Sequence, residues 1–130
     1  MCPTAEGIRR DNELYSGEEL INIARHFQTD FSHITITGGE PFMIRKEIFD
    51  LFGYLRNNLY DIDYLLLTNG RAFCDPEYSE LFKETRPPRM TVGIPLHGYN
   101  SETHDHIVQT PSAFKETFLG LKNLLSNGYP

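Results

Sequence analysis

Three short apolar segments, each followed by a turn that contains glycine, constrain the fold of this chain most strongly. The segments are residues 33–37, 62–68 and 90–96, and their ends read Thr37-Gly38-Gly39, Thr68-Asn69-Gly70 and Leu96-His97-Gly98. Their spacing of about 30 residues is typical of a repeating strand–helix unit. Crossovers of this kind are right-handed and connect parallel strands. We therefore expect one parallel sheet in chain order, with all three glycine-containing ends at the same edge.

A helix signal precedes each of these three strands. Ser16-Gly17-Glu18-Glu19 fits a capping box and predicts a helix over residues 17–28, and a second helix is expected over about 44–58. Asp75 followed by Pro76 predicts the start of a third helix, which Pro87-Pro88 ends. Strands and helices thus alternate along the chain.

The last part of the chain carries two more helix signals. Ser101 is expected to cap a short helical turn that runs through His106, and Ser112 is expected to cap the final helix. That helix has four large apolar residues at helical spacing, which predicts their burial: Phe114, Phe118, Leu121 and Leu125. The continuous apolar centre of 62–68 likewise predicts a strand that is buried on both faces.

This alternation predicts an α/β fold, a partial (β/α) barrel with three parallel strands and alternating helices. A chain of 130 residues is long enough for one domain with one core. The chain opens without a first strand and stops at Tyr129-Pro130, where the next strand is expected. Three strands alone would leave two open sheet edges. We therefore expect residues 1–130 to be a single incomplete domain, cut at both ends.

Composition excludes several classes of protein. Hydrophobic residues make up 39% and charged residues 23%, which is typical of a globular domain. The net charge of −6 argues against nucleic acid as the main partner, because that binding depends on Lys and Arg neutralising phosphates. No apolar run approaches the roughly 20 residues of a membrane span, and no signal peptide is visible. We therefore expect a cytoplasmic protein without a membrane partner.

The first strand end carries a candidate binding loop. Gly38 and Gly39 have no Cβ, so a ligand can approach the main chain there. Pro41 restricts Glu40, the one charged residue of the loop, to an extended conformation. Glu40 is either an acceptor for a cationic group such as an amine or an exposed residue of an ordinary turn. The repetition of glycine at three strand ends favours the functional interpretation, because ligands bind at this edge of parallel α/β folds.

The glycine-containing strand ends and the Gly-Gly-Glu-Pro loop, in their order and spacing along the chain, resemble motifs of the radical S-adenosylmethionine (SAM) superfamily. The resemblance covers nearly the whole chain. The first matching motifs are Thr37-Gly38-Gly39-Glu40-Pro41 and Leu67-Thr68-Asn69-Gly70. The tail matches as well. Residues 92–98 resemble that family's fourth strand, His104-Asp105 resembles the stretch after it, and Ser112-Ala113-Phe114 resembles the next helix start. The chain thus looks like the N-terminal part of a radical SAM core domain.

The resemblance implies a catalytic activity and its cofactors. Enzymes of this family hold a four-iron four-sulfur (4Fe-4S) cluster on three cysteines spaced C-x-x-x-C-x-x-C, and S-adenosyl-L-methionine binds the fourth iron. One electron, from a donor such as flavodoxin or ferredoxin, cleaves SAM reductively to a 5′-deoxyadenosyl radical that abstracts hydrogen. An iron–sulfur oxidoreductase is therefore implied. Its substrate is unknown, and a peptide is one candidate.

The same resemblance assigns the site. Gly38, Gly39, Glu40 and Pro41 correspond to the cofactor-binding loop, in which Glu40 receives the methionine amino group. Asn69 is a second candidate for cofactor contact, although asparagine also suits the backbone of a turn. No catalytic residue is assigned.

Cys2 matches the third cluster cysteine, because it lies shortly before the first helix and precedes Pro3. The other two cysteines would lie upstream of Met1, and a lone thiolate cannot hold such a cluster. We therefore expect the chain as given to be inactive. Pro95 is a second departure, since many family members have a serine there that contacts the ribose.

Other chemistry-bearing residues give weaker signals. His97, His104 and His106 invite a metal interpretation, but two histidines two residues apart point in different directions on a helix. Cys74 has no cysteine neighbour and is expected to be a buried or half-buried thiol. The alternative to an enzyme is a degenerate, non-catalytic α/β module that binds a nucleotide-like ligand without a cluster.

Overall fold

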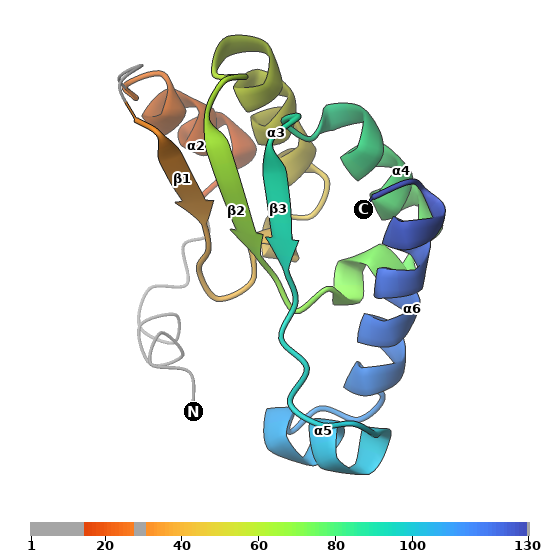
Figure 1. The fold of residues 1–130 in the computed structure, drawn as a ribbon. Helices are drawn as coiled ribbons and strands as arrows, with labels where there is room; N and C mark the ends of the chain where they lie inside the picture. The colour runs from red at the N-terminus through yellow and green to blue at the C-terminus, as the bar shows by residue number, and fades with distance from the viewer. Residues whose placement is uncertain (1–14, 28–30, 130) are drawn as a thin grey trace. The chain divides into compact units, whose positions relative to one another are not determined.

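The computed structural model describes residues 15–27 and 31–129 (Figure 1). These described residues divide into two compact units. The first unit comprises those within Met1–Leu67 and Thr85–Val92, and the second comprises those within Thr68–Glu84 and Gly93–Pro130. Each unit is described by itself below. Within the described ranges, no helix is both long enough and apolar enough to cross a membrane.

The three predicted strands form one parallel sheet in the order β1-β2-β3. β1 spans His33–Ile36, β2 spans Asp63–Leu67 and β3 spans Met90–Gly93. Ile34 pairs with Tyr64 in the parallel register of β1 and β2, and the Tyr64 backbone N–H donates to Arg89 O at 2.9 Å beside β3. The predicted fold class and strand order are thus confirmed. β3 ends three residues earlier than expected, before Pro95, which has no N–H to donate to a sheet.

One face of the sheet carries the core of the first unit. Tyr64 and Leu66 are buried, and the Tyr64 hydroxyl donates to Leu59 O at 2.8 Å, at the end of helix α3 (Glu47–Asn58). Side chains alternate along a strand, so the residues between them point to the other face. There Leu67 is 40% exposed, so the predicted burial of this strand on both faces is wrong for the described residues.

The helices of the first unit are shorter than predicted. Helix α2 (Gly17–Ala24) has the expected Ser16 capping box and ends four residues before the predicted end. The helix predicted over about 44–58 begins only at Glu47, as α3, and a separate 3₁₀ turn, η1 (Pro41–Ile44), precedes it. The break falls at Arg45, whose φ of 55° is incompatible with a continuous right-handed helix.

The second unit contains η2 (Arg71–Cys74), α4 (Pro76–Thr85), α5 (Ser101–Val108) and α6 (Ala113–Ser126). The last residue of α4, Thr85, is assigned to the first unit. The face of α6 that is buried consists mainly of small residues: Ala113, Thr117, Gly120 and Leu124. At Gly120 the helix lies against the backbone of the turn at Gly70, so only small residues fit between them. The predicted burial of Phe118 and Leu125 is therefore wrong, and each is 57% exposed.

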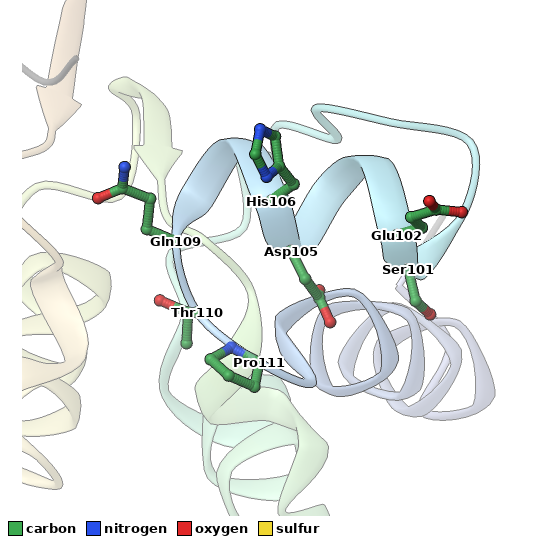
Figure 2. Close-up of a pocket in the computed structure, with 7 residues that line it drawn as sticks. All are labelled: Ser101, Glu102, Asp105, His106, Gln109, Thr110 and Pro111. Carbon is green, nitrogen blue, oxygen red and sulfur yellow. The ribbon is translucent and has the colours of Figure 1, made fainter.

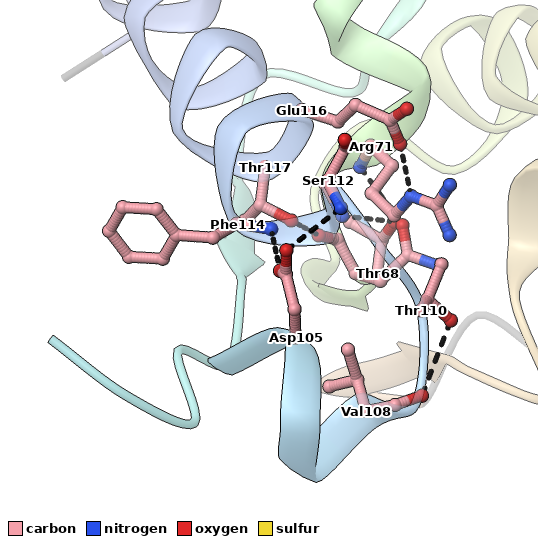
Figure 3. Close-up of polar contacts among 11 residues, drawn as sticks. Thr68, Arg71, Asp105, Val108, Thr110, Ser112, Phe114, Glu116 and Thr117 are labelled. Atoms are coloured by element: carbon pink, nitrogen blue, oxygen red, sulfur yellow. Dashed lines mark hydrogen bonds and ion pairs between the residues drawn. The ribbon is translucent and has the colours of Figure 1, made fainter. Parts of the chain in front are cut away.

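Two predicted helix caps are corrected by the hydrogen bonds. Asn100, not Ser101, caps α5, and its Oδ1 accepts from Thr103 N at 2.9 Å. Ser112 occupies the N-cap position of α6, but its side chain makes no capping hydrogen bond. The carboxylate of Asp105 accepts instead, from the backbone N–H of Ser112 at 2.8 Å and of Phe114 at 2.7 Å (Figure 3).

The buried phenol of Tyr64 provides a test of the first unit. Burial raises the pKa of Tyr64 from 10.0 to about 12. Because the pKa is higher in the folded state, the stabilisation is complete below about pH 10 and is lost as the pH rises towards about 12. We expect tyrosinate absorbance to show a late step that Tyr64→Phe removes. A Tyr64→Phe titration that keeps this step would contradict the assignment.

Candidate cofactor site

The Gly38–Pro41 loop leaves the carboxyl end of β1 with its backbone open to solvent. Gly38 and Gly39 are exposed. Gly38 has a φ of 157°, at the margin of the region that favours glycine, and a Cβ added there would meet nothing within 4 Å. Packing among the described residues therefore does not require the absence of a side chain at Gly38. It leaves a stretch of main chain that a ligand can contact directly.

Glu40 ends this loop as the N-cap of η1. Its backbone is extended (φ −150°, ψ 118°), as the following Pro41 requires, and its Oε1 accepts from Phe42 N at 3.3 Å. The residue is half-buried. A carboxylate has two oxygens and about four acceptor positions, so one carboxylate can accept several hydrogen bonds at once.

Phe42 fixes the end of the loop to the core. Its side chain is 6% exposed, and its ring lies 5.9 Å from that of Phe49 and 6.4 Å from that of Phe52. Both partner rings belong to α3. The carboxylate of Glu40 is therefore carried by a short turn with a rigid anchor, which suits a binding group that must be held in place.

Asn69 belongs to the second unit, where it forms a turn. Its side-chain Oδ1 accepts from Arg71 N at 2.9 Å, and its carbonyl oxygen accepts from Thr117 Oγ1 at 3.0 Å. The side chain is exposed. These bonds give Asn69 a role in the turn, and its contact with a cofactor stays a prediction.

A polar stripe of α6 holds this second turn in place, and sequence analysis missed it. Thr117 Oγ1 donates to the carbonyl oxygen of Asn69, and Asn123 Nδ2 donates to Phe73 O at 2.9 Å. Glu116 forms an ion pair with Arg71 (Figure 3). Residues 116, 117, 120, 123 and 127 recur at helical spacing and are small or polar. That periodicity is the signal that could have identified the face.

The structure describes only one of the two cysteines, Cys74. Cys2 lies outside the described residues, so its role as a cluster ligand stays a prediction. Cys74 is a half-buried free thiol, as expected. Burial, Glu116 and Asp75 raise the pKa of the Cys74 thiol, which disfavours the thiolate that binds metals.

The histidines do not converge on a metal site. His104 is 3% exposed, and its Nδ1 accepts from the backbone N–H of His97 at 3.1 Å. His106 is exposed on α5. Within residues 15–27 and 31–129, no group of three His, Cys, Asp or Glu side chains could hold a metal ion.

An open hollow of about 550 Å³ lies beside α5 (Figure 2). Its lining residues fall between positions 101 and 111, outside the segments predicted to bind the cofactor. It is lined by Ser101, Glu102, Asp105, His106, Gln109, Thr110 and Pro111. The carboxylate of Asp105, which faces it, already caps α6. None of the residues assigned to the cofactor loop lines this hollow.

The fold and the loop together define an α/β protein with a Gly-Gly-Glu loop at the end of a parallel strand. The sequence profile of the Radical SAM superfamily matches residues 1–130. The chain therefore belongs to the radical SAM superfamily.

A curated relative is the AdoMet-dependent heme synthase of Methanosarcina barkeri (strain Fusaro / DSM 804). The two sequences are 30% identical over an alignment of 120 residues. The alignment covers 88% of this chain and 33% of the relative. The chain thus spans about a third of the length of that relative. No solved structure matches the chain.

Proposed function

We propose that this chain forms the SAM-binding part of a radical SAM enzyme. The observation that carries the proposal is the Gly38–Pro41 loop, which combines exposed main chain with the anchored carboxylate of Glu40. Glu40 receives the ammonium group of the methionine moiety, and the main chain of Gly38 and Gly39 lines the approach. When bound to a 4Fe-4S cluster, SAM supplies a 5′-deoxyadenosyl radical for hydrogen abstraction.

The residues present fit this cofactor. A charged acceptor in a half-buried loop binds an ammonium group by a charge-assisted hydrogen bond, which is stronger than a neutral one. Among residues 15–27 and 31–129, no atom lies within 4 Å of a Cβ added at Gly38. Asn69, at the end of the second strand, is proposed as a further cofactor contact.

Cys2 is proposed as one cluster ligand, with two further cysteines supplied by a longer form of the protein. The relative's name states a heme synthase, and its covered third matches this chain. A tetrapyrrole precursor is therefore one candidate substrate. A peptide is the other candidate, and ferredoxin or flavodoxin is the candidate electron donor. Family membership favours the enzyme over a non-catalytic ligand-binding module.

The proposal is tested by SAM binding to the full-length protein after anaerobic cluster reconstitution. Calorimetry is expected to give saturable SAM binding, and SAM is expected to change the electron paramagnetic resonance spectrum of the reduced cluster. A cluster-loaded protein whose spectrum does not respond to saturating SAM would contradict it. SAM binding without any cluster would favour the ligand-binding module.

The cluster assignment makes a prediction about the two cysteines. Cys2→Ser in the full-length protein is expected to remove most of the visible iron–sulfur absorbance, because a cluster held by two cysteines is poorly retained. Cys74→Ser is the matched control and is expected to keep full iron and sulfide content. A Cys2→Ser protein with normal iron content would show that Cys2 is not a ligand.

A further inference from the structure

A side chain of α5 anchors the segment of residues 94–98, which forms neither helix nor strand. The backbone N–H of His97 donates to Nδ1 of His104 at 3.1 Å, and both residues belong to the second unit. This is the one hydrogen bond that residues 94–98 form with residues 15–27 and 31–129. A single imidazole nitrogen is therefore the polar anchor of this segment.

Packing brings the segment and the imidazole together. His104 is 3% exposed, and its ring lies 5.7 Å from that of Phe114 on α6. Gly98 passes so close to α5 that an added Cβ would lie 2.7 Å from His104 N and 2.7 Å from Thr103 Cβ. The segment thus lies directly on α5, which places the backbone N–H of His97 within reach of the ring.

The bond from His97 to His104 requires a neutral imidazole. A backbone N–H can only donate, so Nδ1 of His104 carries a lone pair and the ring proton is on Nε2. An imidazolium has a proton on both nitrogens. Protonation of His104 would therefore set two N–H groups against each other and remove the bond. Histidine is the side chain that ordinarily changes its charge between about pH 5 and pH 8.

The titratable groups around His104 come from two parts of the second unit. The segment contributes His97, which is exposed and whose ring lies 5.7 Å from that of His104. The titratable neighbours along α5 are Glu102, Asp105 and His106. From α6 the contact is the apolar ring of Phe114. Among the described residues no carboxylate is bonded to His104, so none of them ties an imidazolium in place.

We propose that the bond from His97 N–H to His104 Nδ1 is a pH-sensitive latch for residues 94–98. The neutral imidazole holds the segment against α5, and protonation releases it. The bond is therefore present at the upper end of the histidine range and is lost as the pH falls through that range. Release is a local opening that leaves α5 and α6 folded. The latch lies within one unit and does not rest on the proposed SAM site.

Hydrogen exchange of the full-length protein at about pH 8 and about pH 5.5, corrected for the intrinsic exchange rate at each pH, tests the latch. We expect the protection of the His97 amide, resolved by overlapping peptides, to fall at least about fivefold at the lower pH, as the loss of one hydrogen bond implies. Protection of residues 113–126, in α6, is expected to stay within about twofold.

Two variants identify the group that titrates. His104→Asn offers an acceptor oxygen that does not titrate in this range, so the response to pH is expected to disappear. His97→Gln is the matched control, because it removes the neighbouring imidazole and retains the backbone N–H that donates. We expect His97→Gln to respond to pH as the wild type does. Circular dichroism verifies that each variant is folded.

Several outcomes would overturn the latch. Wild-type protection that does not depend on pH would do so, as would a response that persists in His104→Asn or is lost in His97→Gln. An equal fall of protection in α6 would also overturn it, because the whole unit and not the segment would then open. If His104→Asn does not fold, the wild type and His97→Gln decide. A fall in both that is confined to the segment supports the latch, and any other result overturns it.

Discussion

Replacement of Gly120 by alanine is expected to destabilise the second unit by about 3 kcal/mol, at the upper end of the range for overpacked sites. The added Cβ would lie far inside van der Waals contact of the Gly70 carbonyl oxygen and 3.2 Å from Phe73 Cβ. A backbone carbonyl in a hydrogen-bonded turn cannot move aside as the end of a flexible side chain can. Urea unfolding followed by circular dichroism measures the loss.

Gly53→Ala is the matched control for this prediction. Gly53 lies inside α3, and an added Cβ there would meet nothing within 4 Å. Alanine has the higher helix propensity, so this change is expected to stabilise by about 0.5–1 kcal/mol. Equal effects of the two substitutions would show that α6 does not lie against the Gly70 turn as described.

Glu40→Gln in the full-length protein is expected to weaken SAM binding by about 1.5–3 kcal/mol, or roughly ten- to a hundredfold. Glutamine keeps the shape and one acceptor oxygen of Glu40 but removes the charge that an ammonium group requires. The cluster is expected to remain, because its cysteines lie elsewhere in the chain. Calorimetry measures the affinity, and the rate of SAM cleavage is expected to recover in part at high SAM concentration.

Glu84→Gln, the same chemical change at an exposed position of α4, is the control and is expected to leave SAM affinity unchanged. If Glu40→Gln kept wild-type affinity with full cluster content, the carboxylate of Glu40 would not be a SAM ligand.

The sheet was predictable from the sequence because its signals are local. Each strand is a short apolar segment that ends at a glycine-containing turn, and the spacing between the segments leaves room for one crossover. The candidate loop was predictable for the same reason, since Gly38, Gly39 and Glu40 are consecutive. The order of these motifs also carried the resemblance that the superfamily match confirms.

The errors fall where contacts or backbone angles that no local sequence pattern encodes decide the structure. The large apolar residues of α6 predicted its buried face, but the close approach to the Gly70 turn selects Gly120 and Thr117 instead. The cap of α6 comes from Asp105, seven residues before Ser112, and neither pattern nor propensity identifies such a partner. The break before α3 depends on the backbone of Arg45, a residue type that usually continues a helix.

The most direct test of the proposed SAM-dependent radical chemistry is the formation of 5′-deoxyadenosine. The full-length protein, reconstituted anaerobically and reduced with dithionite, is mixed with SAM, and the nucleoside is quantified by liquid chromatography. We expect 5′-deoxyadenosine in the wild type and in Glu84→Gln, and much less of it in Glu40→Gln at the same SAM concentration. Cluster-loaded wild-type protein that binds SAM yet forms no 5′-deoxyadenosine would contradict it.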